Sequence, residues 1–452
     1  MGVVMYLINN VFSQAVFIIG IVVIAGMVAQ KKTWDQILPS VIKTMIGFTM
    51  INVGGQTLGM SLLPLQGMIS KIFNMPPVSV DIGAAQAESL TGIGTEMALI
   101  FALGFLVNLL LARFTRFKYV HLSAHVSFFY AGLIAALLKF GTNLAFVPLV
   151  ITGSILLGFY MTFSCAYVAV FMKEVKGGEG FTLAHSSSIG ILISSLLAKA
   201  FGNKEHDLEN LNVPKKLNFL REMTISLTIV MTVLFLIISL IAGPAWMLEN
   251  ITGGQDIVVF SFLRGLSFGM WITVIITGVR MMLSEIISAF HGFANKIIPN
   301  SVPGLDIPLL FPNYPNSVIL GFLTSLIAGL IGMMILGFIN YPIVVFPALI
   351  PTFFTGAVTA IFGNAHGGRR GAIIGSFVNG LILIFGQALL LPMIGTYAPI
   401  MRILSETDYS FYGPILGWCL SCLEAFNEKF SVLPYFALSG QGNLFSDIRA
   451  IG

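Results

Sequence analysis

The chain has 452 residues, of which 56% are apolar and only 9% are charged, and its net charge is +4. A soluble domain of this length could not cover so many apolar residues with so few charged ones, so the composition excludes that class. The few charges are dispersed along the chain, and we therefore expect no nucleic acid as a partner. These properties predict an all-α polytopic protein that spans a lipid bilayer.

Uncharged apolar stretches follow one another along the chain. The first charged residue is Lys31, so the amino terminus lacks the basic region of a cleaved signal peptide, and we expect the first span to stay in the mature protein. Phe181–Ala198 is shorter, and we expect it to enter the membrane from the cytoplasmic side without spanning it, as a half-crossing. Phe411–Leu423 is also short, so the sequence does not decide whether it forms an eleventh span. The ten predicted spans lie near residues 11–29, 45–68, 97–112, 120–138, 143–172, 225–248, 257–279, 318–338, 343–362 and 372–394.

The second half of the chain weakly repeats the first at an offset of 225 residues. A lysine and an aspartate that recur together carry the most weight, because charged residues are rare here. Such repeats are typical of transporters built from two related halves, and five spans per half would make the halves inverted. The matching positions are Gly67, Lys71, Ile72, Asp81 and Ile82 with Gly292, Lys296, Ile297, Asp306 and Ile307, and Phe128, Phe129 and Ala135 with Phe353, Phe354 and Ala360.

The repeat and the charges together predict four segments. Residues 1–172 form the first inverted repeat, 173–224 the half-crossing with a hydrophilic linker, 225–395 the second repeat, and 396–452 a tail with room for a short membrane-associated helix. The repeat-related stretches 69–96 and 280–317 are rich in glycine and proline and are predicted re-entrant elements. The distribution of basic residues places Lys204 and Arg369 in the cytoplasm and Glu88 and Asp256 outside.

A few polar residues stand in apolar surroundings, where they are costly unless they pair or face a cavity. Asp306 could accept two sugar hydroxyls or act as a base, or it could form a buried pair with Lys296. His185 precedes three serines, whose hydroxyls could bind a polyhydroxylated ligand or their own helix carbonyls. His125 could face a site or bond a neighbouring helix.

The pair Gly54–Gly55 interrupts the second span and allows either a close backbone approach to a ligand or ordinary helix packing. The sequence has no phosphate-binding glycine loop, zinc-protease helix or zinc-finger spacing. Cys419 and Cys422 have no second pair nearby. We therefore expect no cofactor and no metal.

Six short sequence motifs, taken in chain order, carry a resemblance to a known family. They are Ile42–Phe48, Ser123–Phe128, Gly180–His185, Gly278–Glu285, Pro351–Phe354 and His366–Gly371. Together they resemble the ascorbate-type IIC permeases of the bacterial phosphotransferase system (PTS), over roughly residues 40–395. The resemblance implies a homodimer in the bacterial inner (cytoplasmic) membrane, with a core domain that moves against a dimerising scaffold. It also implies a substrate phosphorylated on the cytoplasmic side by a phosphocysteine on a separate IIB protein, which IIA, HPr and enzyme I recharge.

The resemblance also implies substrate contacts. We expect the repeat and the half-crossing to bring Asp306 and His185 together from opposite halves, and these two residues are the predicted catalytic pair. Ser186 and Phe129 stand where the ascorbate pattern has glutamines, and Gly83 stands where it has a tyrosine. Because a missing hydrogen-bond partner changes specificity, we expect a sugar-like substrate that is ascorbate or a related sugar, sugar acid or polyol. The expected substrate contacts are Gly54, Gly55, His125, Phe129, His185, Ser186 and Asp306.

Two other functions compete with this one. A proton- or sodium-coupled secondary transporter of a small polar solute would use Asp306 and the histidines as an ion relay. A function as a membrane scaffold or an intramembrane enzyme would not explain the internal repeat. Phosphorylation of the transported substrate separates the first function from both alternatives.

Overall fold

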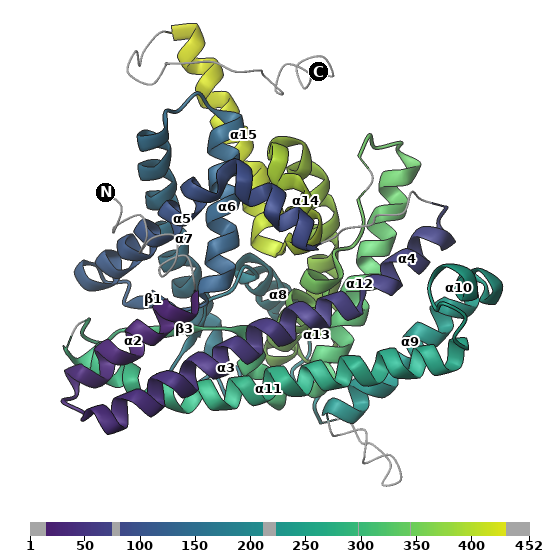
Figure 1. The fold of residues 1–452 in the computed structure, drawn as a ribbon, viewed down its shortest axis with the longest axis horizontal. Helices are drawn as coiled ribbons and strands as arrows, with labels where there is room; N and C mark the ends of the chain where they lie inside the picture. The colour runs from purple at the N-terminus through teal and green to yellow at the C-terminus, as the bar shows by residue number, and fades with distance from the viewer. Residues whose placement is uncertain (1–14, 75–81, 211–222, 297, 344, 431–452) are drawn as a thin grey trace.

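A computed structural model describes residues 15–74, 82–210, 223–296, 298–343 and 345–430, and almost all of them are helical (Figure 1). The helices are α2 (Ala15–Ala29), α3 (Trp34–Ser61), α4 (Leu63–Ile72), α5 (Ile82–Phe114), α6 (Ala124–Gly141), α7 (Phe146–Met172), α8 (Ser188–Phe201), α9 (Met223–Ala242), α10 (Pro244–Asn250), α11 (Ile257–Lys296), α12 (Pro315–Phe338), α13 (Leu349–Leu390), α14 (Ala398–Leu404) and α15 (Thr407–Phe430). Short 3-10 helices lie at Ile307–Asn313 (η3), Leu391–Met393 (η4) and Gly395–Tyr397 (η5).

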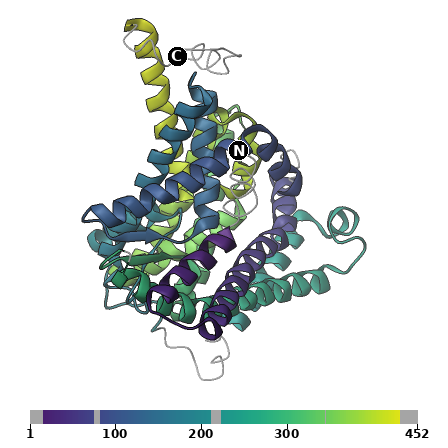
Figure 2. The same ribbon diagram turned by 60° about the vertical axis from the view of Figure 1, so that its left-hand side comes forward.

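The helices form two layers that pack mainly within themselves. We call α2, α3, α4, α9, α10 and α11 the scaffold layer, and the remaining helices the core layer. Figure 1 shows α3, α11 and α9 running side by side, and the turned view of Figure 2 separates this layer from the core. Few contacts join the layers, so their interface is where a cavity can form.

Small residues allow the two longest scaffold helices to pack closely. A Cβ added to Gly47 of α3 would lie 2.6 Å from the carbonyl oxygen of Gly278 in α11, which only glycine avoids. The hydroxyl of Ser40, seven residues before Gly47, donates a hydrogen bond of 2.6 Å to Glu285, seven residues after Gly278. The two helices are therefore antiparallel. They fall at repeat-related positions, but the inverted relation of the two halves stays a prediction.

Helix α13 is a hairpin rather than one straight helix. Its backbone leaves helical geometry at Gly367 and Gly368, where Gly368 has a φ of 60°. The amide of Asn379 donates a hydrogen bond of 2.9 Å to the hydroxyl of Thr355, 24 residues earlier. A continuous helix would separate these residues by about 36 Å. The two arms therefore run back along each other and account for the spans predicted at 343–362 and 372–394.

The described helices confirm the prediction of a multi-pass membrane protein. Six are long and apolar enough to span a membrane, and the bent pair α9–α10 makes seven. Counting the arms of α13 separately and adding the shorter α2 and α6 puts a helix at each of the ten predicted spans. Large apolar side chains such as Ile46, Leu106, Ile151, Val233 and Leu263 are exposed along these helices. A surface of exposed apolar side chains is suited to contact with lipid rather than with water.

Residues 82–96 and 280–296 differ from the expectation of re-entrant elements. They are continuous parts of α5 and α11, which extend over 33 and 40 residues. Neither helix contains a proline, so their glycines are tolerated and the helices continue. Helical structure also ends at Ile72, and residues 75–81 lie outside the described part of the chain. The stretch after Ile298 is not α-helical, and four prolines fall there from Pro299 to Pro312.

A small parallel sheet is the departure from an all-helical fold. Strands β1 (Tyr119–His121), β3 (Val302–Leu305) and β2 (Thr182–Leu183) pair in that order. Tyr119 lies opposite Val302, and Thr182 lies opposite Gly304. The sheet thus joins three segments that are more than 60 residues apart in sequence and sit in the core layer.

Candidate functional site

The small sheet gathers the three polar residues that the sequence singles out. Because its strands are parallel, their carboxyl ends meet at one edge. β1 leads into the first turn of α6, which carries His125. β2 is followed after one residue by His185, and β3 is followed directly by Asp306. Residues from both halves of the chain therefore converge at one point.

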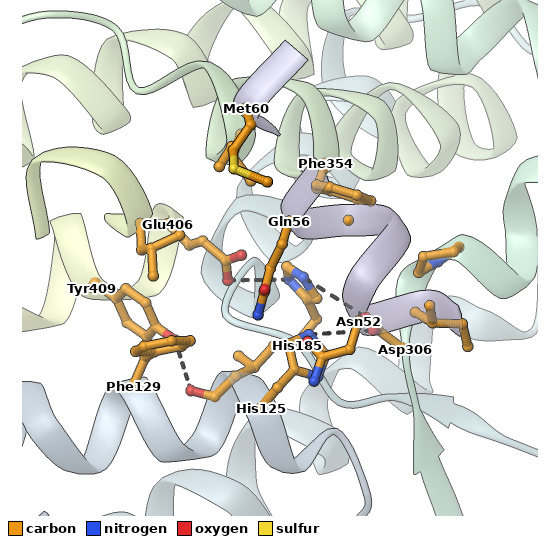
Figure 3. Close-up of a pocket in the computed structure, with 16 residues that line it drawn as sticks. Asn52, Gln56, Met60, His125, Phe129, His185, Asp306, Phe354, Glu406 and Tyr409 are labelled. Carbon is orange, nitrogen blue, oxygen red and sulfur yellow. Dashed lines mark hydrogen bonds and ion pairs between the residues drawn. The ribbon is translucent and has the colours of Figure 1, made fainter. Parts of the chain in front are cut away.

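A cavity of about 130 Å³ lies beside this edge, between the two layers (Figure 3). The scaffold layer contributes one face of α3, including Asn52 and Gln56, and the core layer contributes the remainder. The lining residues are Ile51, Asn52, Gly55, Gln56, Met60, His125, Val126, Phe129, His185, Asp306, Pro308, Ile350, Phe354, Leu404, Glu406 and Tyr409. Its wall is thus mostly apolar with a few converging polar groups, which is the usual build of a small-molecule site.

Asp306 lies between the two histidines. Its Oδ2 is 3.5 Å from Nε2 of His125, and its Oδ1 is 3.7 Å from Nε2 of His185. Its Oδ1 also accepts a hydrogen bond of 2.8 Å from the amide of Ile307, so the carboxylate caps η3. Asp306 therefore pairs with two histidines in this structure, and a pair with Lys296 is not tested by it. The side chain of Lys296 and the whole of Asp81 lie outside the described residues.

Glu406 is a fourth polar group at the site, which the sequence reasoning missed. Its Oε2 is 3.4 Å from Nδ1 of His185, so this imidazole lies between two carboxylates (Figure 3). His185 is almost fully buried, with 4% of its side chain exposed, and Glu406 has 14% exposed. The internal repeat could have indicated this residue. The 225-residue offset relates the half-crossing at 181–198, which contains His185, to residues 406–423, which begin with Glu406.

The segment that carries Glu406 is held in place by Asp408. One oxygen of this carboxylate accepts hydrogen bonds from the hydroxyls of Tyr160 and Ser188, at 2.7 and 2.5 Å, and the other accepts from the amide of Ile189 at 2.8 Å. The carboxylate thereby caps the first turn of α8. The amide of Asp408 donates in turn to the carbonyl of Ser186 at 2.8 Å. These bonds join the start of α15 to the loop that carries His185.

Tyr409 and Phe129 close one side of the cavity. The hydroxyl of Tyr409 donates a hydrogen bond of 2.7 Å to the carbonyl of Val126, and its ring stacks on Tyr130 at 5.1 Å between centroids. Phe129, one helical turn after His125, lines the cavity, and its contact with a substrate stays a prediction. Both rings can pack against the carbon skeleton of a ligand. Tyr409 is a further lining residue that the sequence reasoning missed.

The two glycines of α3 occupy different environments. Gly55 lines the cavity, and an added Cβ would come no closer than 3.9 Å to the ring of Phe354. Gly54 instead faces α11, where an added Cβ would lie 2.8 Å from Ile275. This position fits the helix-packing alternative for Gly54. Ser186 is fully buried beside Glu406 and is not part of the cavity wall. Ligand contact by either residue stays a prediction.

Comparison with known proteins agrees with this architecture. A family model described as "PTS system sugar-specific permease component" matches residues 10–408. The "Ascorbate-specific PTS system EIIC component" of Mycoplasma pneumoniae is 24% identical over 423 residues, and the match covers 81% of this chain. The chain spans 63% of the length of that relative.

The family model covers most of the chain, and the described helices are long and apolar enough to span a membrane. The chain therefore belongs to the family of PTS sugar-specific permease components, and it is a multi-pass protein of the bacterial inner membrane.

Proposed function

We propose that the chain is the membrane-embedded IIC component of a PTS complex and imports a sugar-like substrate that is phosphorylated on the cytoplasmic side. The observation that carries this proposal is Asp306, whose carboxylate lies between His125 and His185 beside a cavity at the interface of the layers. Carboxylates and imidazoles are suited to bind several hydroxyl groups at once. Family membership supports the coupling to phosphorylation.

The proposed chemistry assigns different roles to the side chains. A substrate hydroxyl that donates to Asp306 would have its oxygen free to attack the phosphorus of a phosphocysteine on a separate IIB protein. The bond from sulfur to phosphorus breaks as the new bond to oxygen forms, and the hydroxyl proton passes to Asp306. His185 keeps the carboxylate and the substrate oriented. IIA, HPr and enzyme I would recharge the IIB cysteine.

The division of the cavity between two layers supports a moving core. Asn52 and Gln56 reach the ligand from the scaffold layer, whereas the histidines and the carboxylates belong to the core layer. Displacement of the core would carry the ligand away from these amides and expose it to the other side of the membrane. We further propose that the scaffold layer forms the contact of a homodimer, and that the chain divides at 172, 224 and 395.

Uptake into vesicles tests the proposed function. Vesicles that contain the chain are supplied with IIB, IIA, HPr, enzyme I and phosphoenolpyruvate, and are offered ascorbate, sugars, sugar acids and polyols. We expect a phosphorylated product inside only when the IIB cysteine is intact. Concentrated, unmodified substrate driven by a proton or sodium gradient would instead show a secondary transporter and refute the proposal.

A further inference from the structure

We propose that the cavity selects an uncharged sugar or polyol over an anion such as ascorbate or a sugar acid, and that Glu406 is the residue that sets this preference. The inference rests on the proposed function only in taking the cavity as the substrate site. It narrows the substrate class, and it can be tested by binding alone.

The charges around the cavity are the first argument. Its ionisable lining residues are two carboxylates, Asp306 and Glu406, and two imidazoles, His125 and His185. With ionised carboxylates, the summed charge runs from minus two, when both imidazoles are neutral, to zero, when both are charged. The described lining contains no lysine or arginine. An anionic ligand therefore meets no excess of positive charge.

The apolar remainder of the wall is the second argument. Ile51, Phe129, Ile350, Phe354 and Leu404 face the same cavity, so little water can screen the carboxylates from a bound ligand. Two negative charges that approach each other in such surroundings repel far more strongly than they do in bulk water. Water in a uniformly polar site would screen this repulsion and weaken the preference for an uncharged ligand. The apolar wall of this cavity limits such screening.

Polar atoms that make no hydrogen bond are the third argument. Within the described part of the chain, this holds for Nδ1 of His125, and also for Oε2 of Glu406 and Nδ1 of His185, which form only a loose ion pair with each other at 3.4 Å. Buried polar atoms of this kind are costly unless a ligand completes them. A carboxylate oxygen can only accept a hydrogen bond, so it calls for a donor. The hydroxyl of a sugar or polyol supplies that donor, whereas another carboxylate cannot.

The nearby helix ends supply the fourth argument. The amino terminus of a helix attracts anions because its first amides are unpaired. Here the first amide of η3 is already taken by Asp306, and the amides of Ser188 and Ile189 in α8 are taken by Asp408. Carboxylates of the protein thus occupy the amides at these two helix ends that an anionic substrate would need.

A matched pair of ligands tests the inference on the purified full chain. The pair is a hexitol and the hexonate that differs from it only in a terminal carboxylate, and ascorbate serves as a second anion. We expect the unmodified chain to bind the hexitol roughly 10- to 100-fold more tightly, which is the range for a unit charge about 7 Å from an unscreened carboxylate. Binding of the hexonate or of ascorbate as tightly as the hexitol would overturn the inference.

Substitution of Glu406 assigns the preference to that residue. Glu406→Gln keeps the shape and removes the charge, so it should reduce the ratio of the two affinities at least several-fold. Glu205→Gln, at an exposed glutamate in the linker, should leave the ratio unchanged. An unchanged ratio in Glu406→Gln refutes the role of Glu406. The ligand comparison on the unmodified chain needs no variant. The preference for an uncharged ligand can therefore be refuted even if Glu406→Gln does not fold.

The two proposals fail in different ways. Binding with the expected preference, but without phosphorylation by the PTS proteins, would refute the coupled phosphorylation and leave the charge preference intact. Phosphorylation of the hexonate as efficient as that of the hexitol would support the coupling and overturn the preference. Binding of neither ligand class would refute the cavity as a sugar site, and the preference with it.

Discussion

Replacing Asp306 with asparagine should separate substrate binding from phosphorylation. The amide oxygen of the new side chain can still accept from the amide of Ile307, which is the hydrogen bond of 2.8 Å that holds the present carboxylate. The fold should therefore persist. What disappears is the negative charge that lies 3.5 Å from His125 and 3.7 Å from His185, together with the ability to take up a proton.

The expected magnitudes differ for the two readouts. A hydrogen bond to a charged group contributes about 1.5–3 kcal/mol and one to a neutral group about 0.5–1.5 kcal/mol. The substitution should therefore weaken binding by about 1–1.5 kcal/mol, or about tenfold in Kd. Loss of a general base lowers the rate of the chemical step by about 10²–10⁴-fold. Phosphorylation of bound substrate should fall by that additional factor.

Two measurements on the same preparation decide the outcome. Equilibrium binding gives the Kd, and single-turnover transfer from phosphorylated IIB at saturating substrate gives the rate of the chemical step. Asp35→Asn, at an exposed aspartate in the first turn of α3, serves as the matched control. A variant at position 306 that binds and transfers like the unmodified chain would remove Asp306 from the site. A weaker Kd with an unchanged transfer rate would show a binding residue with no role as a base.

Three further predictions concern other parts of the molecule. His185→Ala should weaken substrate binding by about 1–3 kcal/mol, because it leaves buried partners unsatisfied, and an unchanged Kd would exclude contact. Cysteines at Lys204 and Arg369 should react only from the cytoplasm and one at Asp256 only from outside, and labelling of intact cells by an impermeant reagent would reveal any reversal. The hydrogen bond from Lys204 lowers the pKa of Glu174, which lies in the loop after α7, so its contribution to stability is present above the unfolded-state pKa and is lost as pH falls through the lower folded value. Glu174→Gln should therefore reduce the free energy of unfolding by less than about 1 kcal/mol at neutral pH, and this deficit should vanish in acid, as thermal unfolding across pH 3–7 would show; a deficit independent of pH would contradict the reasoning.

The sequence by itself determined the class of protein, the position of its spans and three of the four ionisable groups at the cavity. Long uncharged stretches must be helical in a bilayer, so hydropathy locates them without knowledge of the fold. The scarcity of polar residues made Asp306, His125 and His185 conspicuous. A lone ionisable residue in apolar surroundings indicates a site because it is too costly to keep without a function.

Only the tertiary structure decided how these residues meet. The strands β1, β2 and β3 contain two to four residues each, which is too short to leave an alternating pattern in sequence. Their pairing depends on hydrogen bonds between segments distant along the chain, and no local propensity predicts such bonds.

Glu406 shows the same limit from another direction. It follows the apolar spans in a mixed segment, where a glutamate ordinarily faces water. Its burial beside His185 arises because Asp408 caps α8 and draws that segment into the core layer. The hydrophobic pattern of the chain thus determines which segments enter the membrane, whereas long-range capping and strand pairing determine which polar side chains share the cavity.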